Sequence, residues 1–316
     1  MSNFVIGSIQ KVFSPKASRR LGLMLAGAST LLLQVGQPAF AGDPFRSEDP
    51  HDISDASEQL FYAMFRDGDY ATAQEYVNSS DASAESDPMF HAMSAALHYL
   101  EEDWEGMQSK AALTRQTAIA LAETDPLRGN LYEAVGIFLD GAYILQTEGI
   151  AQGTPRALAM LQQVFDRLDE AEAIDPEDPE LSLIKGFMDL LLAVNLPFAN
   201  PERAIEHLGT YGKPDYVAYR GIAVGYRDLD RNEEALQAIE QAIAASPQNP
   251  DLLYLKAQIL VRLDRDAEGI DFFGQALAYE DQLPSETAEQ IAVEQCKATG
   301  ERGSVCRERI RNEQEG

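Results

Sequence analysis

The sequence predicts an all-α protein, an α-solenoid of stacked antiparallel helix pairs. Three observations predict this fold class. Apolar residues recur every three or four positions across residues 54–284, polar turns and prolines divide that stretch into about six pairs of segments, and one pattern of small and large residues returns after 34 positions. Because no pair of this kind can bury its apolar face alone, each must cover its neighbour.

Residues 1–41 have the pattern of a secretory signal peptide. Four Lys and Arg precede an apolar run at residues 21–33, and Ala39-Phe40-Ala41 matches the small-x-small cleavage site of a signal peptidase. The run is short for a membrane span, so an uncleaved anchor is the weaker alternative. We expect cleavage after Ala41 and no stable membrane insertion afterwards.

The export route is open at this point. Ser18-Arg19-Arg20-Leu21 resembles part of a twin-arginine signal, but Gly22 stands where that motif usually has a bulky apolar residue. An ordinary charged segment before the apolar run explains the same residues. Both routes lead to the periplasm or an equivalent compartment.

Residues 42–53 are rich in Asp, Pro and Glu without periodicity, which predicts a disordered lead-in. The first helix pair follows at 54–77, with its turn at residues 67–69. The second pair covers 89–123, and its turn at residues 102–104 ends in Trp104, which we expect to pack in the core.

The third and fourth pairs are less regular. In the third, at 127–176, glycines loosen the pattern at residues 146–154, and Pro155 is expected to open the second helix. In the fourth, at 179–213, residues 195–201 lengthen the turn. Gly186 and Ala204, its small contact residues, stand 18 positions apart, against 12 between Ala223 and Ala235 in the next pair.

The fifth and sixth pairs, at 216–249 and 250–284, have the clearest pattern. The fifth has a polar turn at residues 228–232, and Pro247 ends its second helix. Its small and large contact residues reappear 34 positions later in the sixth pair. The correspondence joins Ala223, Tyr226, Ala235, Ile239 and Ala242 to Ala257, Leu260, Gly269, Phe273 and Ala276.

This order of small, large and proline positions resembles the tetratricopeptide repeat (TPR), a 34-residue helix–turn–helix. The resemblance is firm over about 70 residues and weaker over about 160 more. It implies a superhelix over 54–284 whose concave face is lined by the first helix of each pair and binds ligands. The chain also resembles exported bacterial, and especially cyanobacterial, TPR proteins, for which a thylakoid lumen is the alternative compartment.

The last segment, 285–316, is expected to form a capping helix and a charged tail that frays from residue 307. It contains both cysteines, Cys296 and Cys306. Gly300 and Gly303 lie between them and permit a chain reversal, so an oxidising compartment predicts a disulfide that staples the last helices.

The chain is strongly acidic, with 25 Lys and Arg against 52 Asp and Glu. Residues 1–41 contain four of the basic and none of the acidic residues, so cleavage takes the net charge from −27 to −31. Such a field repels nucleic acid and anionic membranes and favours basic proteins or cations. Solubility alone is the simpler explanation of the acidity.

No catalytic or cofactor motif is present, so we expect no enzyme, no cofactor and no metal. Residues 264–269 imitate the start of a calcium loop, but Gln275 stands where the bidentate Glu is needed. His91 and His98 would share a helix face about 10 Å apart, which is wide for one metal ion.

The TPR resemblance places eight residues of the fifth and sixth pairs on the concave face: Val217, Arg220, Val224, Arg227, Asp251, Tyr254, Gln258 and Arg262. Three arginines and a tyrosine suggest a site for a carboxylate or an acidic peptide. Val224 replaces the Asn that some TPR proteins use to hold acidic peptide tails. Alternatively, the arginines pair with Asp228, Asp230 or Asp251 and only hold the stack together.

The function expected from this resemblance is an exported scaffold that binds a protein or a peptide. The alternative is a small-molecule-handling accessory, similar to the T components of TRAP-type uptake systems. Those components tend to be lipid-anchored, and no cysteine stands near the cleavage site to carry a lipid.

Overall fold

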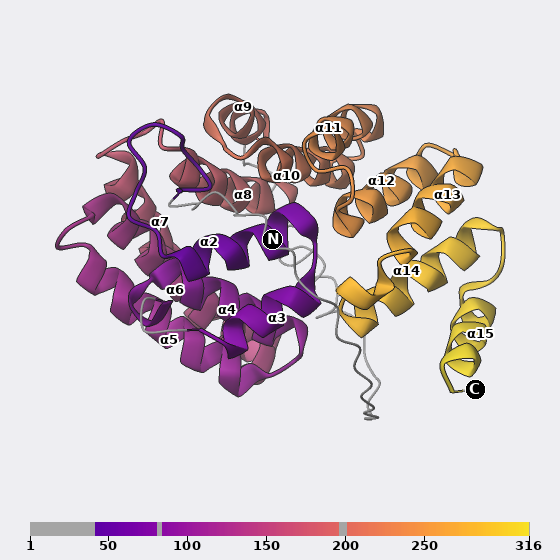
Figure 1. Ribbon diagram of the computed structural model, residues 1–316, viewed down its shortest axis with the longest axis horizontal. Helices are drawn as coiled ribbons and strands as arrows, with labels where there is room; N and C mark the ends of the chain where they lie inside the picture. Colours follow the sequence, from indigo (N-terminus) through magenta and orange to yellow (C-terminus); the bar gives the residue numbers. More distant parts are fainter. Residues whose placement is uncertain (1–41, 81–83, 196–200, 316) are drawn as a thin grey trace, which may run out of the picture.

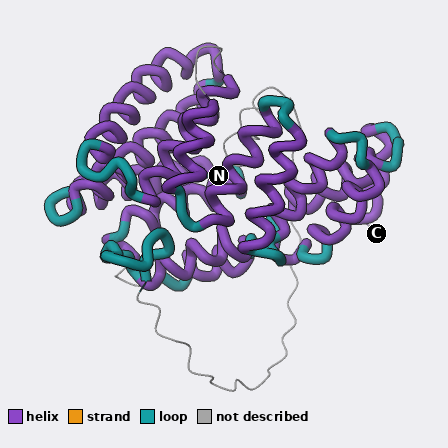
Figure 2. Tube along the Cα trace, turned by 90° about the horizontal axis from the view of Figure 1, so that it is seen from above, coloured by secondary structure: helices purple, strands orange, loops and turns teal. Residues whose placement is uncertain are grey.

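The protein is an all-α solenoid over the residues that the computed structural model describes, 42–80, 84–195 and 201–315. These residues contain 14 α-helices and no strand, and successive helices pack against each other in series (Figures 1 and 2). The expected signal peptide, 1–41, lies outside the described residues.

The elements alternate between first and second helices of successive pairs. In chain order they are α2 (Asp55–Phe61) with a π-helical turn η1 (Tyr62–Asp67), α3 (Tyr70–Asn78), a 3-10 turn η2 (Ala84–Ser86), α4 (Pro88–Leu100), α5 (Trp104–Leu121), α6 (Pro126–Glu148), α7 (Ile150–Glu172), α8 (Pro179–Asn195), α9 (Pro201–Tyr211), α10 (Asp215–Asp228), α11 (Asn232–Ala245), α12 (Pro250–Arg262), α13 (Asp266–Leu277), a 3-10 turn η3 (Glu280–Gln282), α14 (Ser285–Ala298) and α15 (Gly303–Glu315).

Acidic and amide side chains start many of these helices. Asp87, Asp125 and Asn249 precede α4, α6 and α12, and each accepts hydrogen bonds from backbone N–H groups of the first turn. A proline follows each of them, at a position where no N–H is needed. The turns thus satisfy the free N–H groups that begin each helix and fix where it starts.

The small residues of the 34-residue pattern are contact positions. Ala223, Ala235, Ala242, Ala257 and Ala276 are all fully buried. Short side chains at these positions let the helix axes of a pair approach closely.

Close approach also joins the first helices of successive pairs. A Cβ on Gly221 of α10 would lie 2.3 Å from the ring of Phe187 of α8, and one on Gly225 would lie 2.9 Å from Leu190. Only glycine leaves room for these side chains, so the two glycines set the spacing of the fourth and fifth pairs.

The N-terminal pair lies inside the arc formed by the later helices rather than at its end. Figure 1 shows α2 and α3 surrounded by α4–α7, α8–α11 and α12–α14. Besides its neighbours in sequence, this pair contacts distant elements: η1 packs on α10, and α3 packs on η3. The solenoid therefore folds back on its own first pair.

The prediction that residues 42–53 are disordered is wrong. Residues 42–53 form no helix, yet they are packed and not disordered: Phe45 is buried with its ring centroid 5.0 Å from that of Phe61, and Arg46 pairs with Asp178. The polar composition that suggested disorder instead supplies partners for charged groups of the solenoid.

Two helix boundaries also differ from the prediction. Pro155 lies inside α7, which begins at Ile150, so the proline occurs in the second turn and removes one backbone hydrogen bond there. The tail is helical to Glu315 and does not fray from residue 307. The long turn predicted at 195–201 falls mostly on residues 196–200, outside the described part of the chain.

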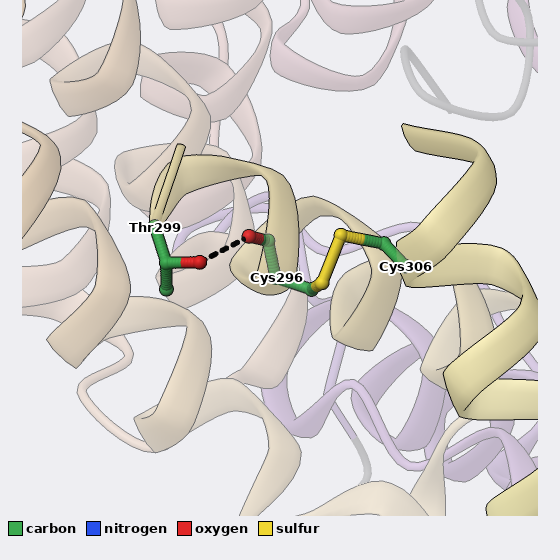
Figure 3. Close-up of a disulfide and its surroundings, with 3 residues drawn as sticks. All are labelled: Cys296, Thr299 and Cys306. Atoms are coloured by element: carbon green, nitrogen blue, oxygen red, sulfur yellow. Dashed lines mark hydrogen bonds between the residues drawn. A yellow bond between two sulfur atoms is a disulfide. The ribbon is translucent and has the colours of Figure 1, made fainter. Parts of the chain in front are cut away.

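A disulfide joins α14 to α15. The sulfur atoms of Cys296 and Cys306 are bonded, with 5.7 Å between the Cα atoms, and both residues are buried (Figure 3). The chain reverses at Gly300, whose φ is +90°, and Thr299 donates a hydrogen bond to the carbonyl of Cys296. This link holds the charged last helix against the cap and explains its order.

We predict that Ala235→Leu destabilises the protein by about 1–3 kcal/mol, because the added carbons overpack a fully buried contact between α10 and α11. Urea unfolding of the chain from residue 42 measures this loss. Ala244→Leu, on the exposed side of the same helix, is the matched control and should change the free energy of unfolding by less than about 0.5 kcal/mol. Equal effects of the two substitutions would contradict the packing role of Ala235.

Candidate functional site

The eight predicted concave-face residues all lie on α10 and α12, and most of them are buried. Val217, Arg220, Val224, Arg227, Asp251 and Tyr254 are no more than 8% exposed, whereas Gln258 is half-buried and Arg262 is exposed. The structure brings them together along two adjacent helices. It also covers most of them with other parts of the same chain.

Arg220 and Asp251 form a buried ion pair that the N-terminal pair completes. Arg220 Nη2 lies 3.2 Å from Asp251 Oδ2, and the hydroxyl of Tyr70, 181 residues away on α3, donates to the same oxygen at 2.6 Å. Burial and the charge of Asp251 raise the pKa of Tyr70 far above its usual value, which keeps the phenol protonated as the donor. Arg220 thus has a structural partner at the position predicted for a ligand.

The turn between η1 and α3 is held beside this ion pair. The amide of Asn249 donates to the carbonyls of Phe65 and Arg66, at 3.0 and 3.1 Å, and Ser246 donates to the Arg66 carbonyl as well. Gly68 has a φ of +67°, and a Cβ there would lie 2.7 Å from Asn249 Oδ1. A side chain at residue 68 would therefore push the turn between η1 and α3 away from Asn249 at the start of α12.

Arg227 is paired inside the solenoid too. Its Nε donates to Asp228 at 2.8 Å, and its Nη1 donates to Gln258 Oε1 at 2.8 Å. Gln258 in turn donates to Glu294 of α14 at 3.0 Å. The capping helix therefore covers this end of the predicted surface, as α3 covers the other.

Arg262 is the predicted arginine that keeps access to solvent. Its side chain is 42% exposed; it donates to the carbonyl of Arg227 at 3.1 Å and lies 3.5 Å from Asp230, which is itself 89% exposed. A surface ion pair of this length contributes little and is easily exchanged for another anion. Arg262 and the half-buried Gln258 are thus the accessible part of the predicted site.

A second polar cluster was not predicted. Arg128 of α6 is 1% exposed, donates to Glu180 at 2.9 Å and stacks near Tyr132, which also donates to Glu180. Asp178, two residues before Glu180 at the start of α8, pairs with Arg46 of the lead-in. The repeated Asp-Pro dipeptides at residues 87–88, 125–126 and 178–179 are the sequence signal that could have indicated these converging helix starts.

His51 links the lead-in to this cluster. Its Nδ1 lies 3.1 Å from Asp43 Oδ2, and Asp125, Asp178 and Glu180 each have an oxygen 4.0 Å from the ring nitrogens. Burial disfavours the charged ring, but the hydrogen bond to Asp43 and the charge of Glu180 raise the pKa of His51 above its ordinary value. The surrounding carboxylates therefore favour the imidazolium more than water does.

Within the described residues, no group of three His, Cys, Asp or Glu side chains is placed to bind a metal ion. His91 is buried against the carbonyl of Glu85, and His98 lies 2.9 Å from Asp103, so the two predicted as an unlikely metal pair have separate partners. No helix in the described part is both long enough and apolar enough to cross a membrane.

No protein-family model matches the sequence, and a search of curated proteins finds no significant similarity.

We predict that Arg220→Ala lowers the free energy of unfolding by about 3–5 kcal/mol, because it leaves the buried Asp251 carboxylate without its cation. Urea unfolding checks this value. Arg265→Ala is the matched control: its side chain is 41% exposed and pairs with Glu268 on the surface, so the loss should stay below about 1 kcal/mol.

The pair itself is isolated by a double-mutant cycle with Asp251→Asn. The double variant should lose clearly less stability than the sum of the two single variants. Strict additivity would mean that Arg220 and Asp251 do not stabilise each other.

We further predict that His51 stabilises the protein at acidic pH and loses this effect as pH rises. A pKa raised by folding gives stability that is complete below the unfolded pKa of about 6.5 and disappears as pH passes the folded value. The difference in unfolding free energy between the parent chain and His51→Asn, measured in urea from pH 5 to 9, should shrink with increasing pH. A difference that grows with pH would contradict the assigned ion pairs.

Proposed function

We propose that the protein is an exported scaffold of the TPR type that binds a protein or peptide segment. The observation that carries the proposal is the combination of an all-α solenoid with a 34-residue pattern whose small residues are buried contact positions. The predicted signal peptide and cleavage site support export to the periplasm or an equivalent compartment.

The binding surface that we propose is the accessible edge at Arg262, next to the half-buried Gln258. Arg220 and Arg227 are committed to Asp251, Asp228 and Gln258, so a ligand would have to break buried pairs to reach them. Arg262 has only a long surface contact to Asp230 and the carbonyl of Arg227 to give up.

Two electrostatic features of the protein indicate the chemistry of the partner: the positive charge of Arg262 at the proposed site and the negative net charge of the whole chain. The guanidinium of Arg262 suits a carboxylate at short range. The surplus of acidic residues attracts basic groups at longer range. A segment that presents a carboxylate, such as a chain end, among basic side chains satisfies both.

We predict that Arg262→Ala weakens partner binding by about tenfold to a hundredfold, the loss expected for one charge-assisted hydrogen bond. The chain from residue 42 is immobilised, exposed to an extract of the compartment from which it comes, and the retained proteins are identified by mass spectrometry. Titration calorimetry with the identified segment then gives the affinity of each variant.

Arg265→Ala is the matched control because it removes the same charge three residues away, at similar exposure, outside the proposed edge. It should bind like the parent chain. Binding lost equally in both variants would indicate general charge attraction, and binding unchanged in Arg262→Ala would place the partner on another surface.

A further inference from the structure

Glu58 is a buried carboxylate without a cation. It lies on α2, is 3% exposed, and its Oε1 is buried with no hydrogen-bond partner. Among the described residues, no Lys, Arg or His forms an ion pair with it. Burial raises the pKa of Glu58, and the charges of Asp55 and Asp43 raise it further, against hydrogen bonds with Tyr62 and the Gly42 backbone that lower it. The described residues therefore supply no positive charge to Glu58.

The start of the lead-in lies against this carboxylate. A Cβ on Gly42 would lie 3.2 Å from Glu58 Oε1, so the backbone of Gly42 is in contact with it. The residues that follow hold Gly42 there: the Asp43 carboxylate accepts from the Phe45 N–H at 2.7 Å, and Phe45 packs on Phe61, one turn of α2 beyond Glu58. These contacts lie within the described residues and hold the start of the lead-in against α2.

The same residue is the first one after the predicted cleavage site. In the uncleaved chain the nitrogen of Gly42 belongs to a neutral amide. Hydrolysis of the Ala41–Gly42 bond by a signal peptidase consumes one water molecule and leaves a carboxylate on Ala41 and, near neutral pH, an α-ammonium on Gly42. Cleavage thus creates a positive charge beside Glu58.

We infer that removal of residues 1–41 completes the folded structure, because the new α-ammonium group of Gly42 forms an ion pair with the buried carboxylate of Glu58. This inference rests on the proposed export of the chain. The ion pair anchors residues 42–53, and these residues place Arg46 beside Asp178 and His51 beside Asp43. Processing by the export machinery is then also a maturation step.

The test compares two chain starts with and without the carboxylate. One protein begins at Gly42, released from a fusion whose protease leaves that glycine first; the other begins at Gly36, so that both start with the same residue type. Each is made with Glu58 and with Glu58→Gln. At pH 7 the Gly42 start should unfold at a higher urea concentration than the Gly36 start, and Glu58→Gln should abolish this difference.

A second measurement follows the amine itself. Its pKa, obtained from the pH dependence of the Gly42 nuclear magnetic resonance signals, should lie about one unit or more above the usual value of about 7.7–8.0. Glu58→Gln should return it to that range. Asp43, Asp55 and Tyr62 also act on Glu58, and following the Gly42 signals separates the titration of the amine from the titration of these groups.

Several outcomes overturn the inference. Equal urea midpoints for the two starts, or a difference that persists in Glu58→Gln, would show that no pair forms. If Glu58→Gln does not fold, an ordinary amine pKa in the Gly42-start protein is enough to reject the pair.

The mass of the protein isolated from its own compartment tests the assumption of export separately. A first residue other than Gly42 would reject the maturation role. A first residue at Gly42 with no coupling in the purified proteins would reject the pair and leave the proposed export intact.

Discussion

The carboxylate of Asp251 joins the N-terminal pair to the fifth and sixth pairs. It lies in the first turn of α12, and it accepts from Arg220 of α10 and from Tyr70 of α3. Its place is set by Asn249, which caps α12 through its side-chain oxygen and holds the carbonyls of Phe65 and Arg66 through its amide. One helix start therefore organises contacts among the first, fifth and sixth pairs.

Positive charge is scarce in this chain, and three of its arginines lie inside the solenoid. Arg128, Arg220 and Arg227 are almost fully buried, and each has a carboxylate partner. A buried ion pair of this kind gives little net stability, since desolvation offsets the attraction, but it strongly disfavours arrangements in which one member is left alone. These arginines specify how the helices fit together. Each is buried together with its carboxylate partner, so the pairs leave the net charge of the exterior unchanged.

The sequence was most informative where contacts are local and periodic. Ala223 and Ala257 could be recognised as contact residues because their spacing reflects a helix pair that repeats. The spacing of the two cysteines, with glycines between them, likewise pointed to the link that the structure contains.

Periodicity carries no information about which distant pairs meet. The contact between Tyr70 and Asp251 joins residues in different periods, so nothing in either repeat identifies the other as a partner. The lead-in was misjudged for a related reason: Asp43 and His51 look like components of a disordered segment until their partners, far along the chain, are known. The prediction of the binding surface was the least accurate, because the repeat pattern places Arg220 where a ligand could bind but does not show that Arg220 already pairs with Asp251.

An open solenoid can gain or lose a repeat during evolution, since each unit meets only its neighbours and a longer array has the same contacts throughout. Here the turn at Gly68 must reach Asn249 across the interior, and that distance depends on how many pairs lie between them and how tightly they curve. Inserting or deleting a pair would carry the two surfaces apart. The contact thus fixes how many pairs lie between the first and the sixth, and it makes some of the contacts that complete folding long-range ones, which form slowly.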